Sequence, residues 1–420
     1  MPGKYQTFQP GEYFDWEQPH VNDRLQAAAE NRAVRQKLIK GPIPPATEED
    51  ILRFNRLWNP YDRLYNDTEY ARSLGFPGVP AYPGYGAPRG TGVAGFPKNI
   101  GDAFYYTNDG YSLKYERRIF AGDVFNPSEV RVDFRDVTPP GADIRIWFNG
   151  GERVYRDQNG EKLITAYGNT RDCYRKIIDG SPKMTFEENM TEWCKYFPPA
   201  HITTDADWDR IRALWAQERV NGEDTPYWED VDIGYELPKT CSDGPVTYMH
   251  LNYWHYIGNW SIFTREELSD PAYLEEIFRD RYGQYLDETS LHYAGRNEPG
   301  ERMVWYNDTG AYLAARTVTN FIGVGGYVTR FRWQFFPYYK ELRTGPIAAD
   351  MFNKVKGMEG RDCERHGSEG DTCIGRAVVI GKRVNEKGEH EVDFAVWGET
   401  LDGEIVQACP MSAVLPSRKG

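Results

Sequence analysis

Apolar and polar residues alternate in two regions of the chain and follow a helical period in others. Alternation in the segments 129–134 and 142–148 predicts strands of an antiparallel meander, with turns at GGERV (150–154) and QNGEK (158–162). A second region of strands is expected after the middle of the chain, over 375–414. Together with the helical segments, these two regions predict a mixed α+β fold.

Helical periodicity marks several segments. They are 22–40, a helix capped by Thr47 and Asp50, a linker helix over 204–220, a helix from Asp270-Pro271 to before Gly283, and 309–322. The last is the clearest, because its apolar residues recur at helical spacing, Asp308 offers a cap and Gly323 offers a stop. Alanines dominate its first turns, so we expect other elements to pack very close to it. Gly and Pro are dense in 83–101, which predicts an irregular loop there.

Composition and charge exclude several classes of protein. The 420 residues include 50 Lys and Arg against 63 Asp and Glu, a net charge of −13, which lacks the basic surface that binding to nucleic acid requires. The mean hydropathy is −0.70 and no apolar run is long enough to span a membrane. The first residues resemble no signal peptide, and six Cys without a CxxC pair suit reduced thiols, so we expect a cytoplasmic protein.

Short words recur in the two strand regions and indicate an internal duplication. FAGDV (120–124) precedes the QNGEK turn in the first region, and SEGDT (368–372) precedes LDGEI (401–405) in the second. The predicted organisation is an N-terminal arm (1–50), a first half (51–180), a helical linker (181–226) and a second half (227–420).

Several longer words, in their order along the chain, resemble the MaoC-like acyl-CoA dehydratase or (R)-specific enoyl-CoA hydratase family in its double hotdog form. These words are LYNDTEYARSLGFPGVPAYPG (64–84), YWEDVDIGYELP (227–238), DETSLHYA (287–294), YNDTGAY (306–312) and AVLPSR (413–418). The resemblance implies two tandem hotdog folds, in each of which an antiparallel sheet wraps a central helix. It also implies an acyl-CoA thioester as substrate and no cofactor, and a homodimer is plausible.

The resemblance points to Asp287 and His292 as the catalytic pair, because the family's hydratase motif places an Asp five positions before a His. An Asp and a His that share one water can take a proton from it and deliver one to the α-carbon of an enoyl thioester. Thr289-Ser290 and Ala294 depart from the motif, and an Asp five residues from a His also occurs by chance. In the first half Tyr65 stands where the motif has His, so the second half is expected to carry the chemistry.

Other residues are candidates for oxyanion stabilisation and substrate binding. Gly310, at the start of the helix over 309–322, is expected to offer its backbone N–H to the developing enolate oxygen. The candidate substrate-binding residues are Tyr306, Asp308, His255 and Arg330. For His255 the alternative is packing in an aromatic core, and for Arg330, which lies near Arg332 on a predicted strand, it is a solvated strand face.

Two other functions fit the same resemblance. One is a hotdog thioesterase, in which a carboxylate activates water against the thioester carbonyl, and the other is a non-catalytic acyl-CoA-binding subunit. A dinucleotide site at the GxGxxG letters of 90–95 is rejected, because no strand precedes them and Pro97 follows. Cys363, His366 and Cys373 match no usual zinc spacing, so no metal is expected.

Overall fold

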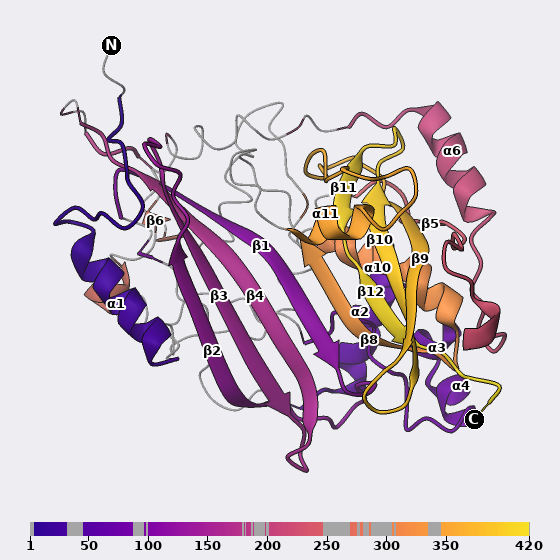
Figure 1. The fold of residues 1–420 in the computed structure, drawn as a ribbon. Coiled ribbons are helices and arrows are strands. Elements are labelled where there is room, and N and C mark those ends of the chain that lie inside the picture. Colours follow the sequence, from indigo (N-terminus) through magenta and orange to yellow (C-terminus); the bar gives the residue numbers. More distant parts are fainter. Residues whose placement is uncertain are drawn as a thin grey trace.

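The computed structural model describes most of the chain. The described residues are 4–31, 45–86, 96–97, 100–178, 180, 182–185, 188, 198, 201–246, 269–274, 278–279, 285–286, 305, 308–334 and 346–419. Within them, one large antiparallel sheet dominates the molecule and helices lie against it (Figure 1). The α+β class predicted from the sequence is therefore confirmed.

The sheet has ten strands in the described residues and runs through both halves of the chain. The strand order is β2 (Asn126–Asp136), β3 (Arg145–Arg156), β4 (Lys162–Arg175), β1 (Ala103–Tyr115), β8 (Tyr327–Gln334), β11 (Ile405–Ala408), β10 (His390–Glu399), β9 (Ile374–Val384) and β5 (Thr240–Cys241). The tenth strand, β12 (Met411–Val414), pairs with β10 and β8. The two halves meet where Gly110–Lys114 of β1 pair with Arg330–Gln334 of β8.

The two halves of the sheet repeat one topology. Outward from the β1–β8 pair, the strands of the first half follow in the order β1, β4, β3 and β2. Those of the second half follow in the order β8, then β11 and β12, then β10 and β9. Of these strands, the one that comes first in the sequence is therefore followed in both halves by the last, and the second lies outermost. This repeat confirms the internal duplication that the sequence words indicated. The boundaries proposed for the arm, linker and halves remain predictions.

Helix α10 (Thr309–Ile322) is the central helix of the second half. Among its residues only Leu313 is not buried, and the helix contacts β9, β10 and the other strands of this half (Figure 1). The alanines predicted to allow close packing, Ala311, Ala314 and Ala315, have no exposed surface. The sequence predicted the bounds of this helix correctly.

The other described elements lie around the sheet, and α2 among them packs against α10 through Phe54 and Trp58. The helices are α1 (Gln18–Ala29), α2 (Glu48–Trp58), α3 (Arg63–Asn66), α4 (Thr68–Ser73), α6 (Asp205–Trp215), α9 (Pro271–Leu274) and α11 (Pro346–Phe352), with a 3₁₀ turn at Trp228–Asp230. Two short strands, β6 (Phe278–Arg279) and β7 (Tyr285–Leu286), pair with each other. No helix of the described residues is long and apolar enough to cross a membrane.

The structure confirms some predicted helix starts and corrects others. Thr47 caps α2 by accepting a hydrogen bond from the Asp50 amide (3.1 Å), as predicted. The first helix starts at Gln18 rather than at residue 22, with a proline in its first turn, and the part of the prediction beyond Asn31 lies outside the described residues. The linker helix ends at Trp215, earlier than predicted.

Two local predictions were wrong. The helix expected to continue from Pro271 towards Gly283 gives way to strand β6. The GGERV segment is not a turn but the middle of β3, because Gly150 lies under the Tyr167 side chain, whose hydroxyl would be 2.6 Å from an added Cβ. Glycines that mark a turn in the sequence are here required for close packing inside a strand.

A buried ion pair fixes the N-terminal arm to the edge of the sheet. Arg145 of β3 and Glu17, just before α1, have fully buried side chains and lie 2.9 Å apart. The Arg145 guanidinium also contacts Asp136 (3.0 Å) and donates to the backbone oxygens of Gln9 and Glu12. The arm is thus held to the sheet by one guanidinium group, which its partners surround.

We expect the substitution Arg145→Met to lower the free energy of unfolding by about 3–5 kcal/mol, because it leaves two carboxylates buried without their cation. Urea unfolding followed by circular dichroism measures the change. The control is Arg131→Met in β2, whose side chain is 77% exposed and 3.9 Å from Glu152, and we expect it to cost less than about 1 kcal/mol. Equal losses in the two variants would show that the buried pair does not hold the arm.

Candidate functional site at the start of helix α10

The N-terminal end of α10 carries a buried carboxyl group. Asp308 is the N-cap residue of the helix, is 5% exposed and makes no side-chain capping hydrogen bond. Burial raises the pKa of Asp308 to about 7, and a hydrogen bond with the Tyr312 hydroxyl opposes part of that rise. A carboxyl group with this pKa is able to exchange a proton near neutral pH.

Tyrosines from the first half surround this end of the helix. The Tyr82 hydroxyl donates to the Tyr312 backbone oxygen (2.9 Å), and the Gly84 amide donates to the Tyr115 hydroxyl (2.7 Å). Gly84 has a φ of +104°, and a Cβ there would overlap the Tyr312 ring. The sequence analysis missed this tyrosine cluster, although the Gly-rich word PAYPGYG was a signal for close packing.

Gly310 is held in a tight contact that its lack of a side chain permits. A Cβ at Gly310 would lie 3.0 Å from the Trp305 ring, and a Cβ at Gly367 would overlap the same ring. The Trp305 indole N–H donates to the backbone oxygen of Ser368 (2.7 Å). Trp305 therefore packs directly against Gly310, and the role of Gly310 as an oxyanion donor stays a prediction.

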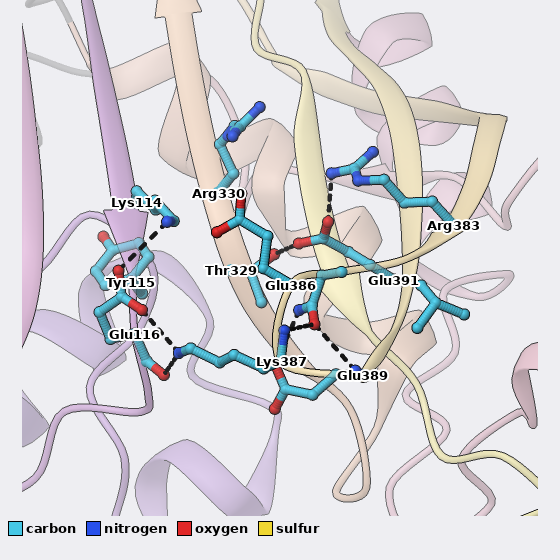
Figure 2. Close-up of a pocket in the computed structure, with 12 residues that line it drawn as sticks. Lys114, Tyr115, Glu116, Thr329, Arg330, Arg383, Glu386, Lys387, Glu389 and Glu391 are labelled. Carbon is cyan, nitrogen blue, oxygen red and sulfur yellow. Dashed lines mark hydrogen bonds and ion pairs between the residues drawn. The ribbon is translucent and has the colours of Figure 1, made fainter.

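A groove where the two halves meet contains Arg330. It has a volume of about 320 Å³ and lies among β1, β8 and the hairpin between β9 and β10. Lys387 from the hairpin reaches Glu116 (2.7 Å), which also pairs with Lys114 (3.4 Å), as Figure 2 shows. Because these ion pairs join the hairpin of the second half to the end of β1 in the first half, they link the two halves.

Arg330 differs from the other cations of this groove. Arg383 pairs with Glu391, which also contacts Thr329, whereas Arg330 has no ion pair with any described residue and points away from the paired groups (Figure 2). Alternation along β8 puts Arg330 on the face opposite Phe331, whose ring lies 5.9 Å from Tyr312 of α10. The structure therefore does not bring Arg330 together with Asp308 and Gly310, and its contact with CoA phosphates stays a prediction.

Four predicted site residues cannot be placed. Asp287, His292, Tyr306 and His255 lie outside the described residues. The described part of the site is therefore the start of α10, with Asp308 and Gly310 from the prediction and Tyr312 added by the structure. No group of three or more potential metal ligands occurs in the described part of the chain.

Comparisons with known proteins concern the fold. No family model and no curated protein sequence matches the chain. A solved MaoC-like dehydratase is similar over 90% of this chain and 97% of its own, with 15% identity and a TM-score of 0.48. A MaoC domain dehydratase from Chloroflexus aurantiacus covers 90% and 94%, with 12% identity and a TM-score of 0.45.

A third similar structure is a conserved hypothetical protein from Mycobacterium tuberculosis that is described as a double hotdog fold. It covers 90% of this chain and 97% of its own, with 13% identity and a TM-score of 0.45. At such identities the likeness concerns the fold alone, so the fold assignment depends on the repeated strand order and on the sheet wrapped around α10. The double hotdog arrangement predicted from the sequence is confirmed on that ground, and the matched structures name the family that the sequence resembles.

The raised pKa of Asp308 predicts how stability depends on pH. In the unfolded chain this carboxyl group ionises near pH 4, so between about pH 4 and 7 the folded protein binds a proton that the unfolded chain has released. Stability should therefore fall by about 4 kcal/mol as the pH rises through that window. Asp62, whose pKa burial raises to about 6, acts in the same direction.

We expect Asp308→Asn to remove this dependence, so that the variant gains stability relative to the wild type between pH 5 and pH 8. Urea unfolding at both pH values measures the gain. The control is Asp402→Asn, which removes an exposed carboxylate (62% exposed) and should show no such gain. If Asp308→Asn loses the same free energy at both pH values, the Asp308 carboxyl group is not kept protonated by the fold.

Proposed function

We propose that this protein adds water across the α,β double bond of an acyl-CoA thioester, or removes it in the reverse direction. The observation that carries the proposal is the start of the buried helix α10, where the Asp308 side chain makes no capping hydrogen bond to the first amides and has a pKa near 7. A helix start of this kind stabilises negative charge on a thioester oxygen. The names of the similar solved structures, MaoC-like dehydratases, support the same reaction class.

The reaction needs a base, an acid and a group that stabilises the enolate. We assign the base to Asp287, which takes a proton from water as the water oxygen bonds to the β-carbon. His292 delivers a proton to the α-carbon, and the reverse steps give dehydration. Both assignments depend on the five-residue spacing in the sequence.

Asp308 has a separate role in this proposal. A buried carboxyl group that stays protonated near pH 7 can donate a hydrogen bond to the thioester oxygen as negative charge develops on it. The neighbouring Tyr312 hydroxyl and the start of α10 keep that carboxyl group in place. Ionisation above pH 7 would turn the donor into a repelling charge, so the proposal implies lower activity in alkaline solution.

The test is hydration of trans-2-enoyl-CoA thioesters, followed by the loss of the enoyl absorbance. We expect Asp287→Asn and His292→Ala each to lower kcat/KM by about 100-fold or more, since each removes one proton-transfer group. The control is Asp209→Asn, at a side chain that is 80% exposed on α6, and we expect it to keep wild-type activity.

The same assay separates hydration from its alternative. Release of free CoA thiol without loss of the double bond would identify a thioesterase and contradict the proposal. Wild-type turnover by both Asp287→Asn and His292→Ala would show that the two residues are not the catalytic pair.

A further inference from the structure

The inner face of the first-half sheet, which is the face towards α10, has a polar band between two hydrophobic clusters. One cluster contains Trp147 and Phe134 and packs under α1, and the other contains Tyr155 and Ile164 and belongs to the core around α10. Alternate residues of β3 and their partners on β4 form the band between them. The band consists of the polar residues Asn149, Arg153 and Thr170, with Gly151, Gly168 and, at the border of the α10 core, Ala166, all buried.

Arg153 is a buried cation without a partner in the described structure. Arg153 is 4% exposed, and its Nε has no hydrogen-bond partner. No ion pair links it to any described residue. Other buried arginines differ, since Arg145 pairs with Glu17 and Arg316 pairs with Asp243. A buried guanidinium without an anion is unfavourable, so Arg153 would be stabilised by an anion bound beside it.

Two more polar groups on the same face lack partners. The Oδ1 atom of Asn149 has none, and its Nδ2 makes only a long contact of 3.5 Å with the Thr170 hydroxyl. The indole N–H of Trp333, which is 1% exposed, also has none. Native proteins leave few buried polar groups unsatisfied, and of these three the donors, Arg153 and Trp333, are the ones that an anion could satisfy.

The strand register connects this band to the start of α10. The Trp333 ring lies 5.6 Å from the Tyr312 ring, and Trp333, Tyr111, Gly168 and Gly151 lie opposite one another on successive strands. Three strand spacings separate Trp333 from Gly151, which is about 14 Å. The Tyr111 ring lies beside Trp333 at 5.5 Å, and Gly168 and Gly151 place no side chain at the next two positions of the row.

We propose that this band binds a carboxylate at the far end of the acyl chain, so that the substrate is the CoA thioester of a dicarboxylic acid. The thioester part of this proposal rests on the proposed function, whereas the carboxylate part is argued from the residues of the band alone. A guanidinium binds a carboxylate through two parallel hydrogen bonds, and Arg153 is the cation of the band that can make them. A single negative charge suits one buried Arg better than the phosphates of CoA, which carry more charge and stay hydrated.

The first test compares pairs of trans-2-enoyl-CoA thioesters of six to twelve carbons that end in a methyl or a carboxylate group. We expect the wild type to have at least about a tenfold higher kcat/KM on the carboxylate member of a pair. Arg153→Met should lower kcat/KM on that member by about 100-fold and change it little on the methyl member, as loss of charged hydrogen bonds predicts. Arg153→Lys keeps the charge but cannot make two parallel hydrogen bonds. Its kcat/KM on the carboxylate member should lie between the values of the wild type and Arg153→Met.

The control variant is Arg131→Met, because Arg131 lies on the opposite face of β2 and its side chain is 77% exposed. It should retain the wild-type preference. Equal activity of the wild type on both members of each pair, or an equal loss on both in Arg153→Met, would overturn the proposal.

A second test does not depend on turnover. Adipyl-CoA, which cannot be hydrated, should raise the Tm of the wild type more than hexanoyl-CoA does, and Arg153→Met should abolish the difference. If enoyl thioesters are not hydrated but this difference persists, the proposed reaction fails and the carboxylate site stands. Without ligand, Arg153→Met should be at least as stable as the wild type, because it removes an unpaired buried charge; a clear loss of stability would instead identify Arg153 as a structural group and overturn the proposal.

Discussion

The structure depends on the burial of a charged residue at the centre of helix α10. Arg316 is 1% exposed, and its guanidinium donates to the backbone oxygens of Trp58 (2.9 Å) and Cys241 (3.1 Å) and pairs with Asp243 (3.1 Å). Burial alone would lower the pKa of Arg316, but the Asp243 carboxylate reverses that shift and keeps the group charged. Since these partners come from the end of α2, from β5 and from the turn after it, one side chain fixes the helix against both halves. The position of Asp308, two turns earlier on the same helix, follows from that fixed axis.

The two halves share one core as well as one sheet. A single cluster of buried residues includes Tyr115 and Leu113 of β1, Phe331 and Trp333 of β8, and Tyr312 of α10. The β1–β8 pairing makes the sheet continuous, and the ion pair between Lys387 and Glu116 joins the β9–β10 hairpin to the end of β1. A continuous inner face allows a ligand at the start of α10 to extend over the first half without leaving the protein interior. Under the proposed function, the second half would hold the reacting group and the first half the rest of the substrate.

The sequence predicted what depends on local patterns and missed what depends on distant contacts. Helix 309–322 was found because its period, small residues and Gly stop are all local, and the same holds for the cap at Thr47. The GGERV segment was misassigned because a Gly pair usually marks a turn, whereas here Tyr167 from the next strand covers Gly150. That error concealed Arg153, which is only seen to face inward once β3 is one strand. Local patterns also could not show the surroundings of Asp308. Its neighbour Tyr312 is in contact with Tyr82 and Gly84, which lie more than 200 positions earlier in the sequence. The catalytic pair expected at Asp287 and His292 remains a prediction from spacing.

A net charge of −13 is compatible with an anionic substrate because binding depends on local rather than total charge. Surface carboxylates more than about 8–10 Å from a site are largely screened by salt, whereas a buried guanidinium acts through a medium of low polarisability and is screened far less. Arg153 can therefore attract a carboxylate within an acidic protein, provided that the carboxylate reaches the buried face. Asp308 and Arg153 then have complementary roles along one surface, since the first stays neutral to approach a developing oxyanion and the second stays charged to hold a permanent anion.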